Sequence, residues 1–123
     1  MKMFDRIVAW TMLAFALLHM TVVVVLMSRN LTIGTAWSFA GGLAIIFCVF
    51  LNLIRTYRPP DKVIVRISVL ANLLLVILSV LLLAASRHDL KANPQVVVFL
   101  VLTVLQLLLP TRQWLRYETA RPA

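Results

Sequence analysis

Four long apolar stretches dominate this chain of 123 residues. They cover residues 7–27, 36–54, 63–85 and 96–114, and none of them contains Asp, Glu or Lys. A helix needs about 20 apolar residues to cross the hydrocarbon layer of a bilayer, so each stretch has the length of one crossing. The stretches are continuously apolar, whereas a strand of a membrane barrel alternates and needs only about ten residues. The sequence therefore predicts an all-α integral membrane protein with four transmembrane helices.

Composition and loop length indicate a single membrane domain. The chain is 63% hydrophobic and only 13% charged, which excludes an ordinary soluble domain and a disordered chain. No connection between the stretches is long enough to hold a soluble domain, so residues 1–123 are predicted to form one four-span domain. Because short connections favour antiparallel neighbours, we expect an up-down-up-down bundle. Pro110 is expected to kink or end the fourth helix, since it lacks a backbone N–H.

Lys and Arg are shared unequally between the two ends of this predicted bundle. Because short cytoplasmic loops are enriched in Lys and Arg, both termini are predicted to face the cytoplasm, as in a multi-pass protein of a bacterial inner membrane. The net charge of +8 then reflects this topology and contact with anionic lipids, and no binding of nucleic acid is expected. Nine cations lie at the end with both termini, namely Lys2, Arg6, Arg55, Arg58, Lys62, Arg66, Arg112, Arg116 and Arg121, and three at the other end, namely Arg29, Arg87 and Lys91.

A few strongly polar side chains interrupt the apolar stretches. Counted from the centre of each stretch, His19, Asn72 and Gln106 lie within about 5 Å of the midplane, at 1.5 Å per residue. Asn52 lies about 12 Å away, toward the predicted cytoplasmic boundary. Amide and imidazole groups face lipid tails only at a cost, so we expect these side chains to turn inward or toward a partner. Two interpretations remain open, either hydrogen bonds that join helices or an intramembrane site of His19, Asn72 and Gln106.

Small residues recur near the start of the second stretch. Gly34, Ser38 and Gly42 are spaced four apart, which places them on one side of the predicted helix. Small side chains let two membrane helices approach closely. We therefore predict that these three positions form a helix-packing face, which Asn52 continues on the same side.

The chain shows no motif for catalysis, a cofactor or a metal. It contains no spaced Cys and His set, no glycine-rich phosphate loop and no nucleophile elbow. Its four acidic residues, Asp5, Asp61, Asp89 and Glu118, fall outside the apolar stretches, which argues against a proton or ion pathway. We therefore expect neither an enzyme nor a cofactor or metal site.

Two segments are similar to parts of the small four-span accessory protein encoded beside bacterial F-type ATP synthases. One runs from Gly41-Gly42-Leu43-Ala44 to Arg58, and the other is Val104-Leu105-Gln106-Leu107-Leu108-Leu109-Pro110. That family carries charged residues within its third span, where this chain has Ser68 and Asn72. The resemblance implies a role in assembling the rotor ring of the synthase.

Two functions are compatible with these features. The first is a non-enzymatic accessory, assembly or scaffold subunit that packs against another membrane protein or a second copy of itself. The absence of soluble domains and the small-residue face favour it. The alternative is a minimal transporter or small-ligand-binding bundle, with a polar cavity at the midplane around His19, Asn72 and Gln106.

Overall fold

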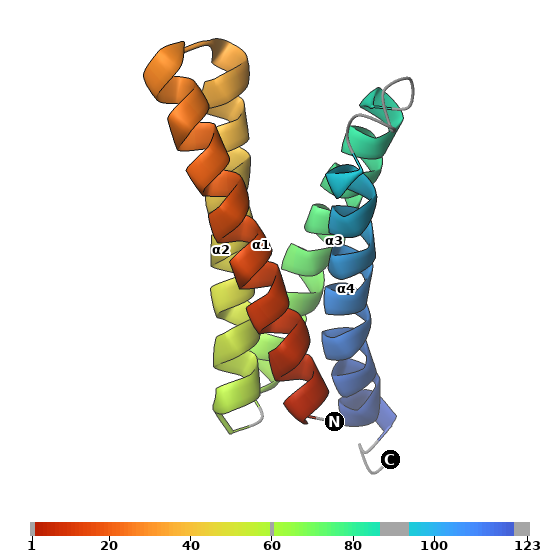
Figure 1. Ribbon diagram of the computed structural model, residues 1–123. Coiled ribbons are helices and arrows are strands. Elements are labelled where there is room, and N and C mark those ends of the chain that lie inside the picture. Colours follow the sequence, from red (N-terminus) through yellow and green to blue (C-terminus); the bar gives the residue numbers. More distant parts are fainter. Residues whose placement is uncertain (1, 60, 87–93, 120–123) are drawn as a thin grey trace.

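The computed structural model describes residues 2–59, 61–86 and 94–119, and in these ranges the chain is helical apart from short connections (Figure 1). The helices are α1 (Lys2–Arg29), α2 (Ile33–Tyr57), α3 (Lys62–Ala85) and α4 (Gln95–Thr119). Each of them includes one of the four apolar stretches and is long and apolar enough to cross a membrane. The prediction of an all-α protein with four helices of membrane-spanning length is therefore confirmed.

Side-chain caps define where two of the helices begin. Before α2, the Thr32 hydroxyl accepts the Thr35 N–H at 3.1 Å, and the Thr35 hydroxyl accepts the Thr32 N–H at 3.0 Å. This reciprocal pair satisfies backbone donors that have no partner inside the helix. Before α3, the Asp61 carboxylate accepts the N–H groups of Val63 and Ile64 at 2.8 and 3.4 Å. These caps fix the first residues of α2 and α3.

Pro110 does not end α4, contrary to one of the two sequence expectations. The helix continues beyond it to Thr119, and Pro110 is itself buried. A proline removes one backbone hydrogen bond, which a helix of 25 residues packed against its neighbours tolerates.

The four helices form two antiparallel hairpins, α1–α2 and α3–α4 (Figure 1). Helices pack most extensively within each hairpin, and the hairpins meet through α2 with α3 and, less extensively, through α1 with α4. In Figure 1 the hairpins lie close together at the end where α1 begins and α4 ends, and they diverge toward the opposite end. We call these the terminal end and the distal end.

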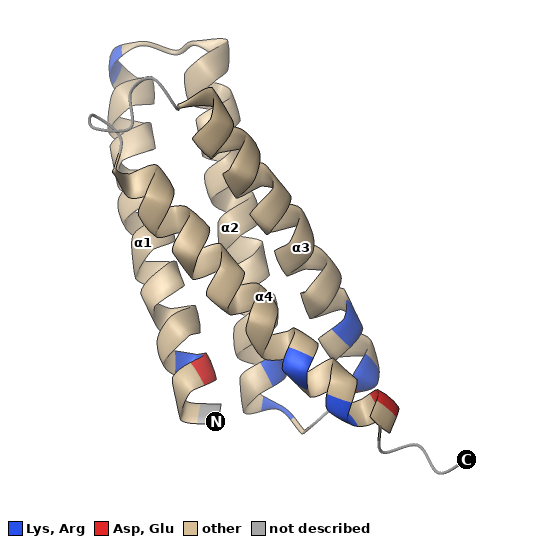
Figure 2. Cartoon of the chain, turned by 90° about the vertical axis from the view of Figure 1, so that its right-hand side faces the viewer, with Lys and Arg blue, Asp and Glu red and all other residues tan. Residues whose placement is uncertain are grey.

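The surface of the bundle is largely apolar. Leu70, Leu74 and Leu81 on α3 illustrate this, since each is more than half exposed. The described Lys and Arg residues gather at the terminal end, apart from Arg29 at the distal end (Figure 2). Arg87, Asp89, Lys91 and Arg121 lie outside the described residues. An apolar girdle with charges restricted to the ends is the distribution that a bilayer requires.

Candidate functional site

Three buried amides connect the two hairpins in the half of the bundle nearer the terminal end. Asn52 of α2 donates through Nδ2 to Asn72 Oδ1 at 3.0 Å and to Gln106 Oε1 at 3.3 Å. Asn72 of α3 donates back through Nδ2 to Asn52 Oδ1 at 3.0 Å. All three side chains are at most 2% exposed. The structure therefore brings together three of the four polar residues singled out in the sequence.

The helix backbone orients two of these amides. Asn52 Nδ2 also lies 2.9 Å from the carbonyl oxygen of Cys48, so its two hydrogens are shared among three acceptors. Asn72 Nδ2 donates to the carbonyl of Ser68 at 2.7 Å. Both carbonyls lie one turn back on the same helix. Each amide is thus held by its own helix while it bonds to the facing helix, as expected of interhelical hydrogen bonds in an apolar medium.

Two polar atoms of this region lack a partner within the described chain. They are Gln106 Nε2 and Ser68 Oγ, and both are buried. A polar atom without a partner in an apolar interior carries a desolvation cost. The network is therefore not fully satisfied.

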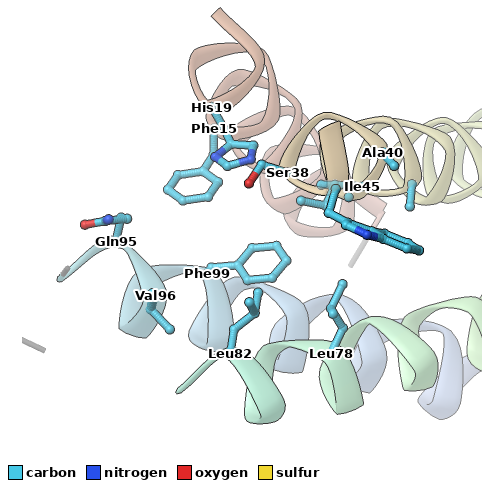
Figure 3. A pocket seen from close by; sticks show the side chains of 13 residues that line it. Phe15, His19, Ser38, Ala40, Ile45, Leu78, Leu82, Gln95, Val96 and Phe99 are labelled. Carbon is cyan, nitrogen blue, oxygen red and sulfur yellow. The ribbon is translucent and has the colours of Figure 1, made fainter. Parts of the chain in front are cut away.

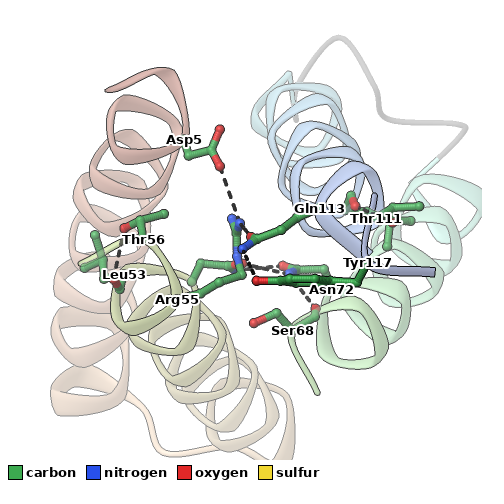
Figure 4. A network of polar contacts seen from close by, with 11 residues as sticks. Asp5, Leu53, Arg55, Thr56, Ser68, Asn72, Thr111, Gln113 and Tyr117 are labelled. Atoms are coloured by element: carbon green, nitrogen blue, oxygen red, sulfur yellow. Dashed lines mark hydrogen bonds and ion pairs between the residues drawn. The ribbon is translucent and has the colours of Figure 1, made fainter. Parts of the chain in front are cut away.

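A second buried network, which the sequence did not predict, lies closer to the terminal end. Arg55 donates through Nη1 to Gln113 Oε1 at 2.8 Å and to Asp5 Oδ2 at 3.4 Å (Figure 4). Asp5 and Arg55 are only 8% and 6% exposed, whereas their positions outside the apolar stretches predict the charged membrane boundary. Arg55 follows Asn52 by three residues, so the two side chains share a face of α2. That spacing was the signal in the sequence that Arg55 points inward.

The structure does not place His19 with the amides. Its side chain is half-buried and lines a separate pocket nearer the distal end (Figure 3). The depth of each residue, counted from the centre of its apolar stretch, does not predict which polar side chains meet, because the helices are staggered along their axes. Asn52 lies five residues from the end of α2 at Tyr57, whereas Asn72, to which it bonds, lies ten residues from the start of α3 at Lys62.

The pocket lies between the diverging hairpins and has a volume of about 590 Å³. Its lining comes from the distal halves of all four helices. The rings of Phe15 on α1 and Phe99 on α4 stack across the two hairpins, with centroids 6.1 Å apart and planes 12° apart. Trp37 is 74% exposed, and Ala40 and Ala44 are also exposed, so this wall is open to the surroundings of the bundle. The three polar residues of the lining are His19, Ser38 and Gln95.

The predicted packing face of Gly34, Ser38 and Gly42 is divided in the structure. Gly42 is buried against α1, where an added Cβ would collide with the Met20 sulfur. Gly34 and Ser38 are exposed, and Ser38 lines the pocket while its hydroxyl donates to the Gly34 carbonyl at 2.9 Å. Positions four apart rotate by about 40° per step, so Gly34 and Gly42 face directions about 80° apart. Of these three positions, Gly42 is the one that lies in close contact with another helix among the described residues.

The described residues contain no group of three or more His, Cys, Asp or Glu side chains that would hold a metal ion. Comparison with known proteins found no matching family model, no similar curated protein and no similar solved structure. The resemblance to the accessory protein of ATP synthases gains no support from these comparisons.

Proposed function

We propose that this protein is a non-enzymatic, multi-pass membrane protein that binds a small apolar ligand between its two hairpins. The observation that carries the proposal is the pocket of about 590 Å³ lined by all four helices. Ligand pockets in proteins have volumes of about 300–1,000 Å³ and are mostly apolar with a few polar groups. The pocket lining, in which three polar residues stand among apolar ones, fits that description.

The position of the pocket favours a ligand that reaches it from the membrane. The excess of Lys and Arg at the terminal end supports an orientation with both termini in the cytoplasm of a bacterial cell. The pocket then lies in the outer half of the inner membrane, where its exposed wall meets lipid tails. A ligand dissolved in the hydrocarbon layer enters sideways without crossing water.

The two polar networks support a preformed pocket. The Asn52–Asn72–Gln106 bonds and the bond from Arg55 to Gln113 join the two hairpins in the terminal half. Asn52, Asn72 and Gln106 are buried in this network and do not line the pocket. A pocket that is open before binding saves the free energy of separating the helices.

An accessory, assembly or scaffold role is the second candidate, and one observation favours it. Ala40, Gly41 and Ala44 form a small-residue wall of the pocket on α2, and a Cβ added at Gly41 meets nothing within 4 Å. A helix of another membrane protein, or of a second copy of this chain, would approach such a wall closely.

Photolabelling with a small apolar diazirine in lipid nanodiscs tests ligand binding. The expected result is saturable labelling of Phe99, which is only 5% exposed and so protected from bulk lipid. Gly41→Leu places a bulky side chain in the pocket and is expected to lower this labelling at least tenfold. Ala14→Leu adds the same side chain at an exposed position outside the pocket and is expected to have no effect. Labelling of Phe99 that never saturates, or that Gly41→Leu leaves intact, would contradict the proposal.

A further inference from the structure

We infer that the pocket selects an uncharged, membrane-soluble molecule with a flat ring, a hydrogen-bonding oxygen on that ring and an apolar tail. This is the chemistry of an alkylated quinone or phenol. The inference rests on the proposed ligand-binding function and names the ligand class. His19 would be the residue that recognises the oxygen.

The described residues that line the pocket favour an uncharged ligand. None of these 13 residues is Asp, Glu, Lys or Arg. An ion that leaves water for an apolar site without a counter-charge loses its solvation and gains nothing in return. The ligand must therefore be neutral, or carry its charge outside the pocket.

His19 supplies a hydrogen-bonding group that the protein itself does not use. Its imidazole lies on the wall of the pocket close to Phe15 (Figure 3), and it has no hydrogen bond to any residue within the described chain. The neighbouring Ser38 hydroxyl donates to the Gly34 carbonyl. One nitrogen of a neutral imidazole donates and the other accepts, so an unpartnered ring in an apolar setting is costly. A carbonyl or hydroxyl oxygen on the ligand would remove that cost, whereas an acyl chain would not.

The aromatic residues favour a flat ring next to His19. Phe15, which precedes His19 by one helical turn, is stacked at 6.1 Å with Phe99. Aromatic rings pack on one another in offset stacks and edge-to-face pairs, and both arrangements add to the free energy of apolar burial. Beyond this pair the pocket is bounded by Ala44 on α2 and by Leu78 and Leu82 on α3. This apolar channel between the hairpins suits a tail that leads out into the membrane.

The test compares two probes that each carry a flat six-membered ring and a ten-carbon tail. Decylubiquinone carries ring oxygens and decylbenzene carries none. Each is added at increasing concentration to compete with diazirine labelling of Phe99 in nanodiscs. In wild-type protein, half-maximal competition is expected at a concentration of decylubiquinone about tenfold lower than that of decylbenzene. A factor of this size is the effect of one buried hydrogen bond. His19→Leu is expected to abolish this difference.

Two further variants show whether the imidazole acts through its hydrogen bond. His19→Gln retains a donor and an acceptor and is expected to restore most of the preference for decylubiquinone. Thr21→Val removes an exposed hydroxyl two residues from His19 and is expected to preserve the preference for decylubiquinone fully. If His19→Leu does not fold, the comparison of the two probes in wild type and in His19→Gln decides whether the pocket prefers a ring that carries oxygen.

The outcomes separate the inference from the function on which it rests. Equal competition by both probes in wild type, or a preference that survives His19→Leu, overturns the ligand class and leaves apolar binding intact. Saturable labelling that neither probe displaces also overturns the ligand class. The absence of saturable labelling overturns both proposals.

Discussion

Single polar residues decide how the helices of this protein meet. Asn52 and Asn72 exchange two hydrogen bonds of 3.0 Å between the hairpins, in a region where the other buried side chains are mostly apolar. An amide without a partner is costly there, so the pair strongly disfavours any other register of α2 against α3.

Removing both amides is predicted to cost less than the sum of removing each one alone. Asn72→Leu leaves the Asn52 carbonyl oxygen without its donor and should lower the free energy of unfolding by about 1–3 kcal/mol. The double variant Asn52→Leu, Asn72→Leu should lose less than the sum of the two single variants, because no unpaired amide of the couple remains. Unfolding by stepwise addition of SDS, followed by circular dichroism, measures these values.

Asn30→Leu provides the matched control. It makes the same chemical change at an exposed position between α1 and α2 and should leave stability unchanged within about 0.5 kcal/mol. Strict additivity of the two buried substitutions would show that the amides do not interact.

At the scale of elements, α1 contacts α4 and, more extensively, α2. Along its length it packs against α2, and near its start Asp5 lies 3.4 Å from Arg55. Arg55 also bonds to Gln113, so a single side chain of α2 connects the start of α1 with the last turns of α4. The Arg6 guanidinium lies 4.1 Å from the centre of the Tyr57 ring and adds a second contact there. The terminal end is thus held by charged groups and the middle by amides.

Breaking the buried ion pair is predicted to loosen the start of α1. Asp5→Asn leaves the buried Arg55 without its counter-charge and should lower the free energy of unfolding by about 3 kcal/mol. Hydrogen exchange of the backbone amides in the first two turns of α1 should increase more than exchange elsewhere. Glu118→Gln removes the charge of the exposed pair with Arg66 and should cost at most about 1 kcal/mol. Similar losses in both variants would argue against a special role for the buried pair.

For the molecule as a whole, the contrast between its two ends matters most. The terminal end is closed by buried polar contacts, and the distal end holds an open apolar pocket. The proposed orientation places the closed end at the cytoplasm and the pocket in the outer half of the membrane.

Cysteine labelling in intact bacteria tests this orientation. In a Cys48→Ala background, Leu31→Cys lies in the exposed connection between α1 and α2 and should react with a membrane-impermeant maleimide added outside the cells. Thr119→Cys, at the end of α4, should react only after the membrane is disrupted. The reverse pattern would invert the protein and place the pocket in the inner half of the membrane.

The amino-acid sequence by itself determined the four helices. The length and continuity of an apolar stretch are properties of that segment alone, and they are sufficient for it to cross a bilayer as a helix. The sequence also indicated the polar positions that had to leave the lipid, among them Asn52, Asn72 and Gln106. Only the tertiary structure decided which of them meet. The separation of His19 from the amides, the burial of Arg55 and the pocket all depend on the tilt and stagger of the helices. Those quantities are set by side chains on different helices packing together, such as Gly42 against Met20 and Phe15 against Phe99, and no single segment of the sequence contains them.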